Sequence, residues 1–178
     1  MNTKVTILLS IAALLFCTPP LMAQSSPDKT KLKQFLDQAA QDNREEIALG
    51  AETVKKAGEN LPLKSFGSML KADHRVNQEA VESLAATKNV SLSEARMKTS
   101  DAKLLHMTGD QFAAEVADSQ IKDHQAAIQK FQTAESEFQS DPQVEMYIKQ
   151  TLPVLETHLK EAQLLKQHLD QQQKIARE

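Results

Sequence analysis

This sequence has few of the residues that proteins use for cross-links or for stacking on bases. It contains one cysteine, one tyrosine and no tryptophan. A single cysteine forms no disulfide within the chain, and the formal net charge of −3 comes with no basic block. Because nucleic-acid binding needs a basic stripe, usually with aromatic rings, we exclude nucleic acid as a partner. A glycine-rich phosphate loop, a nucleophile elbow and a Cys-x-x-Cys motif are also absent from the sequence.

The first 23 residues have the pattern of a cleaved signal peptide. Lys4 supplies a positive charge, residues 5–16 are an apolar run, and Ala23 is a suitable last residue before cleavage. This run is too short to span a bilayer as a helix, which takes about 20 residues. We therefore expect an exported protein that is periplasmic or associated with the outer membrane. Its mature chain, residues 24–178, has no second run long enough for a transmembrane span.

Cys17 offers an alternative end to this leader. It follows Leu14-Leu15-Phe16, so lipidation of Cys17 would anchor the protein, although Phe16 is bulky where a small residue is preferred. Cleavage after Ala23 would instead remove the cysteine, and the loss of Lys4 would change the formal net charge from −3 to −4. Both processing routes stay open at this point.

The mature chain reads as one domain of four amphipathic helices. Apolar residues recur every three or four positions, which is the helical period, and no stretch keeps the alternation of a strand. Capping residues and prolines place the helices near 26–58, 62–89, 109–138 and 142–171, with N-caps at Ser26, Thr108 and Asp141. Residues 91–106 are predicted to form a short helical connector, and residues 171–174 are expected to fray. Short turns within each outer pair predict an antiparallel four-helix bundle of all-α class.

Each predicted helix carries one ionisable residue on its apolar stripe, namely Glu46, His74, His124 and His158 in chain order. Burying such groups is costly unless they are paired, hydrogen-bonded or bound to a metal. Imidazoles and carboxylates from facing helices are how bundles build metal sites. We therefore predict that the four side chains converge in the interior and can hold one divalent ion. Zn²⁺, Mn²⁺ and Fe²⁺ all suit this ligand set.

An aspartate precedes two of these histidines, as Asp73-His74 and Asp123-His124. Adjacent residues on a helix are rotated by about 100°, so an aspartate does not easily bind the same ion as the histidine that follows it. Asp73 and Asp123 are instead predicted to orient a histidine on the neighbouring helix, a role that carboxylates often have around metal sites.

Two other interpretations remain. The cluster can be a buried hydrogen-bond network in a structural or interaction module of the cell envelope, with no metal. An iron-dependent oxidoreductase is less favoured, because the di-iron pattern of Glu-x-x-His on each of two helices is absent. Lys71, Ile121 and Leu155 stand three residues before the histidines. We predict no catalytic residue, and the sequence does not decide whether the protein is an enzyme.

Four segments make the chain resemble a bacterial exported family, the domain of unknown function 4142, which is placed among ferritin-like bundles. The segments are Glu46–Gly50, Met69–His74, Ile121–His124 and Leu152–Leu159. The resemblance covers nearly the whole mature chain and implies a ferritin-like bundle in the periplasm or envelope, with no established activity. The family usually has Phe-Asp-x-x-Tyr at the start of the third helix. Here Phe112 is kept, but Ala113 and Val116 replace the other two, so any role of those polar groups is lost.

Overall fold

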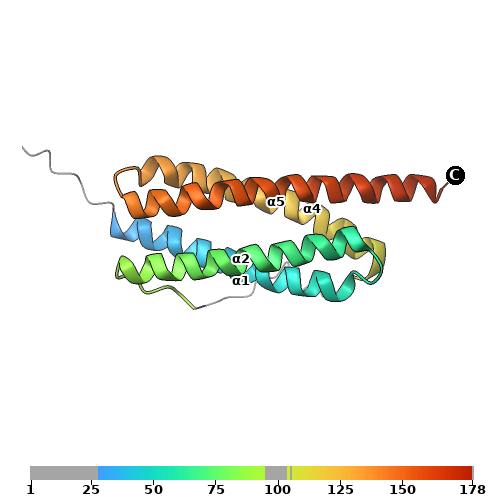
Figure 1. The fold of residues 1–178 in the computed structure, drawn as a ribbon, viewed down its shortest axis with the longest axis horizontal. Helices are drawn as coiled ribbons and strands as arrows, with labels where there is room; N and C mark the ends of the chain where they lie inside the picture. Colours follow the sequence, from blue (N-terminus) through green and yellow to red (C-terminus); the bar gives the residue numbers. More distant parts are fainter. Residues whose placement is uncertain (1–27, 95–103, 105, 178) are drawn as a thin grey trace, which may run out of the picture.

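The computed structural model describes residues 28–94, 104 and 106–177. Within these ranges the chain forms no strand and four long helices: α1 (Lys29–Lys56), α2 (Leu61–Thr87), α4 (Gly109–Glu137) and α5 (Pro142–Ile175). The prediction of an all-α four-helix bundle is confirmed (Figure 1). The predicted signal peptide and Cys17 lie outside the described residues. Among the described helices, none combines the length and the apolar composition that a membrane crossing needs.

Capping side chains fix where three of the helices start, two of them with a proline in the first turn. Asn60 and Asp141 each accept hydrogen bonds from amides in the first turn of α2 and α5, and each of these turns contains a proline. The bonds satisfy backbone donors that have no partner inside a helix. Proline suits the first turn because it lacks such a donor. The predicted start of α5 at Asp141-Pro142 is confirmed.

Two predicted helix ends are wrong. α1 is capped by Asp28 and not by Ser26, because the Asp28 carboxylate accepts a hydrogen bond from the amide of Thr30 at 2.8 Å. The polar end of α5, expected to fray from residue 171, stays helical to Ile175. Local cap signals at neighbouring positions are too similar for the sequence to rank them.

The predicted helical connector between α2 and α4 is wrong at its start, although Leu104 near its end is helical. Residues 91–94 are not helical. There the amide of Ser93 donates to the Asp37 carboxylate of α1 at 2.8 Å, which ties this segment to the bundle. Most of the remaining connector lies outside the described residues. Thr108 stands at the predicted N-cap of α4, but its side chain makes no capping bond.

The helices form two antiparallel hairpins that lie side by side (Figure 1). α1 packs on α2, α4 packs on α5, and the hairpins meet mainly through α2 and α5, whereas α1 and α4 make little contact. Ion pairs Lys88–Asp141 and Lys31–Glu137 place the end of α2 and the start of α1 beside the turn from α4 to α5. α2 therefore ends, and α4 begins, at opposite ends of the bundle.

A polar layer divides the interior into two hydrophobic clusters. On each helix, at least one buried polar residue lies between residues that belong to the two clusters: Asn43 on α1, His74 on α2, His124 on α4 and His158 on α5. One cluster includes Leu36, Phe131 and Ile148, and the other includes Phe66, Phe112 and Leu165. The layer between them includes Asn43, His74, His124 and His158, all buried. Three imidazoles thus lie near the middle of the bundle's length.

Two glycines allow α1 and α2 to approach closely. A Cβ atom on Gly50 would lie 2.7 Å from the carbonyl oxygen of Gly67 and 2.7 Å from the amide nitrogen of Lys71. A Cβ atom on Gly67 would lie 2.8 Å from the Cβ of Thr53. Such short contacts do not occur, so this crossing depends on glycine at both positions. The close approach helps to hold Asn43 of α1 next to His74 of α2.

Candidate metal centre

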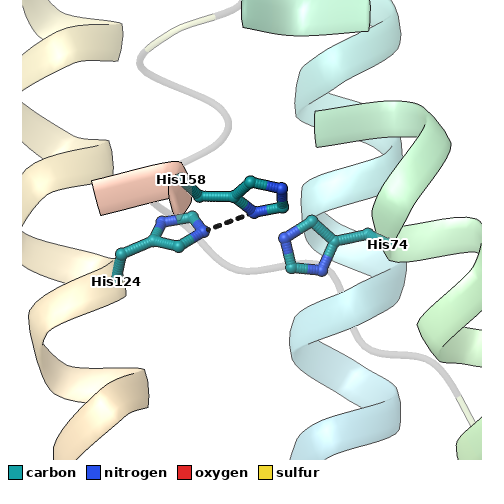
Figure 2. A group of neighbouring side chains, drawn as sticks. All are labelled: His74, His124 and His158. Carbon is teal, nitrogen blue, oxygen red and sulfur yellow. Dashed lines mark hydrogen bonds between the residues drawn. The ribbon is translucent and has the colours of Figure 1, made fainter. Parts of the chain in front are cut away.

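The structure brings the three predicted histidines together. His74 of α2, His124 of α4 and His158 of α5 face one another across the bundle (Figure 2). One ring nitrogen of each lies within 4.8 Å of one from each of the others. The side chains are 5%, 2% and 1% exposed. This is the arrangement that a metal ion held by imidazoles from several helices requires.

On each ring, one nitrogen is bonded to an oxygen that can only accept. The bonds are His74 Nδ1 to Asn43 Oδ1 (2.9 Å), His124 Nδ1 to the carbonyl oxygen of Gln120 (3.1 Å) and His158 Nε2 to Asp73 Oδ2 (2.9 Å). The N–H group of each neutral imidazole must therefore be on the nitrogen that makes this bond. The other nitrogen of each ring then carries a lone pair.

These lone pairs face a common centre. Nε2 of His124 and Nδ1 of His158 are 3.2 Å apart, and with these tautomers neither has a proton to donate. Nε2 of His74 is buried and has no hydrogen-bond partner among the described residues, and Figure 2 shows a nitrogen of His74 turned toward the other two rings. Lone pairs this close repel each other. A cation between them, either a proton or a metal ion, removes the repulsion.

Burial makes a proton a poor choice for that cation. The pKa of His124 is lowered to about 4, chiefly by burial and then by repulsion from the charge that His158 would carry. Burial, with repulsion from both other histidines, holds the pKa of His74 well below its usual range. Burial also lowers the pKa of His158, although the bond to Asp73 opposes this effect. At neutral pH the three imidazoles are therefore neutral, which is the form that binds metals.

The remaining predicted residues differ in their places. Asp73 lies where an orienting role needs it, bonded to the outer nitrogen of His158. Asp123 is exposed and its orienting role stays a prediction. Glu46 is only half-buried, and its Oε1 accepts a hydrogen bond from Gln120 Nε2 at 3.0 Å. Glu46 is not in the group of ligand atoms that lie within 4.8 Å of one another, so its role as a fourth ligand also stays a prediction.

A set of uncharged polar groups behind His74 was not predicted from the sequence. Asn43 Nδ2 donates to Asn77 Oδ1 at 2.8 Å, and the hydroxyl of Tyr147 donates to the same oxygen at 2.8 Å. Asn77 Nδ2 donates to Thr151 Oγ1 at 2.7 Å. These bonds fix the Asn43 amide so that its oxygen faces the imidazole, and burial raises the pKa of Tyr147. All four stand three or four residues from a buried apolar neighbour on the same helix, which is the signal that would have found them.

Comparison with known proteins identifies the family to which the chain belongs. The family model described as "Domain of unknown function (DUF4142)" matches residues 18–165, which include all three histidines. The chain belongs to this family. No curated protein and no solved structure matches it. Because the family description assigns no activity, the function of this DUF4142 member has to be argued from its own residues.

A pocket opens beside the histidines in this DUF4142 member. It lies between α1 and α4, where those two helices make little contact, and has a volume of about 140 Å³. His74 and His124 form part of its wall, together with Glu46 and Asp123. Two of the three imidazoles therefore border a pocket on one side of the bundle, although each ring is almost completely buried.

Proposed function

We propose that this DUF4142 member binds one divalent metal ion through His74, His124 and His158. One observation carries the proposal. Each ring donates its N–H to an acceptor outside the centre, which leaves three lone pairs facing one another in the interior. Histidines that bind metals typically have their second nitrogen held in this way by a carboxylate, a carbonyl or a similar acceptor.

Zn²⁺ is the ion that this ligand set favours. Imidazole nitrogens suit zinc, copper, iron and nickel, whereas manganese prefers carboxylate and water oxygens. Three histidines with a fourth, non-protein ligand are a known zinc arrangement. Fe²⁺ and Mn²⁺ would be favoured more if Glu46 moved to join the three rings, since a carboxylate would then be added to the set.

We also propose that the protein acts outside the cytoplasm, in the periplasm or at the envelope. The support is the signal-peptide pattern of residues 1–23 alone. Intact-mass spectrometry of the exported protein tests it. A chain that begins near Gln24 agrees with cleavage after Ala23, whereas a diacylglyceryl group on Cys17 would mean that the protein is a lipoprotein.

The contact of 3.2 Å between His124 and His158 also supports a second candidate function. A proton shared between these two rings would make the layer a metal-free hydrogen-bond network in a structural module. That arrangement buries a positive charge and leaves Nε2 of His74 without a partner among the described residues. Both are costly in a protein interior, so we place the metal site first.

Elemental analysis tests the metal site. The protein is purified without chelator and without a polyhistidine tag, and is then titrated with Zn²⁺ by calorimetry. We expect one ion per chain for the wild type and none for His124→Ala. His106→Ala removes an exposed histidine outside the centre, so it should bind like the wild type. A wild type that binds neither Zn²⁺, Cu²⁺ nor Fe²⁺ would leave the structural module as the better explanation.

A further inference from the structure

The pocket between α1 and α4 borders the histidine centre on one side. His74 and His124 form part of the pocket wall, whereas His158 does not. Glu46 also lines the wall, but it is bonded to Gln120 and lies outside the group of converging ligand atoms. An ion held by the three imidazoles would therefore border the pocket, and the group of converging ligand atoms among the described residues contains no fourth member.

We infer that the metal keeps a fourth coordination position open to this pocket and binds a small neutral nitrogen or oxygen donor there. The inference rests on the proposed metal site. Structural zinc sites usually have four protein ligands, whereas sites with three keep the fourth position for water or a substrate. Among the described residues, three ligand atoms converge here. The centre therefore belongs to the sites with three protein ligands and a fourth position for water or a substrate.

The size and lining of the pocket limit the ligand to a few atoms. A volume of about 140 Å³ is close to that of an engineered cavity of about 150 Å³ that holds one benzene molecule. A five-membered ring such as imidazole fits this space. Asn43, Asn77 and Thr151 line the pocket together with apolar side chains such as Phe131 and Leu155, so a ligand that is partly polar and partly apolar suits it.

The charges around the pocket disfavour an anion. Asp42, Glu45, Glu46 and Asp123 all line it. Lys130 lines it too, bonded to the Asp42 carboxylate at 2.7 Å. Four carboxylates and one ammonium group sum to a charge of −3, which a divalent ion would change to −1. A cleft lined by charges of one sign repels ions of that sign. A neutral donor enters without this repulsion.

The Co²⁺-loaded protein tests the inference, because the visible absorption of Co²⁺ changes when a ligand is added or exchanged. Wild-type protein carrying one Co²⁺ is titrated with imidazole, and the cobalt that remains after desalting shows that the ion was not removed. We expect a saturable change in the spectrum. Ala127→Leu fills part of the pocket, so it should still bind one Co²⁺ but bind imidazole about tenfold more weakly, or worse.

Two further variants guard against misfolding and non-specific effects. Ala126→Leu places the added side chain at an exposed position of the pocket wall and should also weaken imidazole binding. Ala51→Leu adds the same group on an exposed part of α1 outside the wall and should bind imidazole like the wild type. Unchanged Co²⁺ binding in all three variants shows that the centre is intact.

Four results would overturn parts of this picture, and they differ from one another. If imidazole leaves the wild-type spectrum unchanged, the open position is wrong although the metal site stands. If imidazole acts equally on the wild type and on the pocket-filling variants, the metal has an open position that does not face this pocket, and the inference is wrong in that respect. If imidazole acts only on Glu46→Gln, then Glu46 fills the fourth position and the inference also fails. A wild type that binds no Co²⁺ contradicts the proposed metal site itself.

Discussion

Asp73 of α2 and His158 of α5 are joined by a hydrogen bond of 2.9 Å between the carboxylate Oδ2 and the ring Nε2. The Asp73 side chain is 45% exposed, whereas that of His158 is 1% exposed. The bond therefore connects the surface of the bundle to its centre. It also fixes the ring so that Nδ1 faces His124, the orientation in which His158 can bind a metal.

Asp73→Asn should weaken Zn²⁺ binding by about 10- to 100-fold, the usual loss when the outer partner of a metal-binding histidine is changed. The carboxylate orients the ring and makes it more basic. An amide in its place would raise the basicity of the ring less. The stoichiometry should remain one ion per chain, and the melting temperature of the metal-free protein should change little. Competition with a chromophoric chelator measures the affinity.

Asp118→Asn is a matched control for this change, because Asp118 is an exposed carboxylate of α4 that pairs with Lys166 away from the centre. Its affinity for Zn²⁺ should equal that of the wild type. If Asp73→Asn also keeps the wild-type affinity, Asp73 does not position a metal ligand and its bond to His158 is only structural.

The metal-free bundle should lose stability as the pH falls below about 6.5. Unfolded histidine has a pKa near 6.5, whereas burial lowers the pKa values of His74, His124 and His158 in the folded state. As the pH falls through this range, the unfolded chain takes up protons that the folded chain does not, so the free energy of unfolding decreases. With a folded pKa of about 4, His124 alone accounts for about 3 kcal/mol by pH 4.

Urea unfolding with chelator present, at several pH values between 6.5 and 5, measures this effect above the range in which most carboxylates titrate. His124→Gln should show a shallower dependence on pH, because one of the titrating groups is gone. A free energy of unfolding that stays constant over this interval would mean that the imidazoles are protonated, or exposed, in the folded protein.

Gly50→Ala should destabilise the bundle by about 1–3 kcal/mol, the usual cost of forcing an extra methyl group into a packed interface. Helix propensity alone predicts the opposite sign, a gain of about 1 kcal/mol for alanine over glycine. The clash decides because the new Cβ would lie 2.7 Å from backbone atoms of Gly67 and Lys71, which do not move away easily. Urea unfolding gives the sign, and a more stable Gly50→Ala protein would contradict the close crossing of α1 and α2.

The sequence predicted the bundle and its three central histidines for the same reason. Long helices with an apolar stripe bury that stripe, and an imidazole on the stripe is carried into the interior with it. His74 and His158 each stand three or four residues from buried apolar neighbours, and His124 stands at this spacing from the partly buried Ile121 and Ile128. Their convergence therefore needed no knowledge of the detailed packing. What periodicity could not settle is how the helices are rotated and staggered against one another.

The position of Glu46 is an example of what the helical period does not predict. Glu46 also lies on the apolar side of its helix, yet it is half-buried at the pocket wall and bonded to Gln120. The placement of α1 relative to the other helices decides this, and no single helix reveals contacts between helices such as the close approach of Gly50 to Gly67. Asn43 was overlooked for a related reason. An uncharged amide draws little notice in a sequence, and its importance comes from a partner, His74, on another helix.

His74→Ala and His124→Ala should act on one shared property, because both rings belong to one centre. If the centre binds a metal, each change should abolish stoichiometric binding. Each should then remove the rise in melting temperature that Zn²⁺ gives the wild type, since a ligand that binds only the folded form stabilises it by mass action. The double mutant should behave like either single mutant when metal is present. Thermal melts of all four proteins, with chelator and with Zn²⁺, make this comparison.

The same melts distinguish a metal-free network from a metal site. In a network, each single change would leave buried partners unsatisfied and would destabilise the chelator-treated protein by about 1–3 kcal/mol. The double mutant would then lose less than the sum of the two, as expected for residues in one network. His106→Ala, at an exposed position, should match the wild type in every condition. Losses that add up fully and do not depend on Zn²⁺ would mean that His74 and His124 share neither an ion nor a network, and the proposed centre would have to be given up.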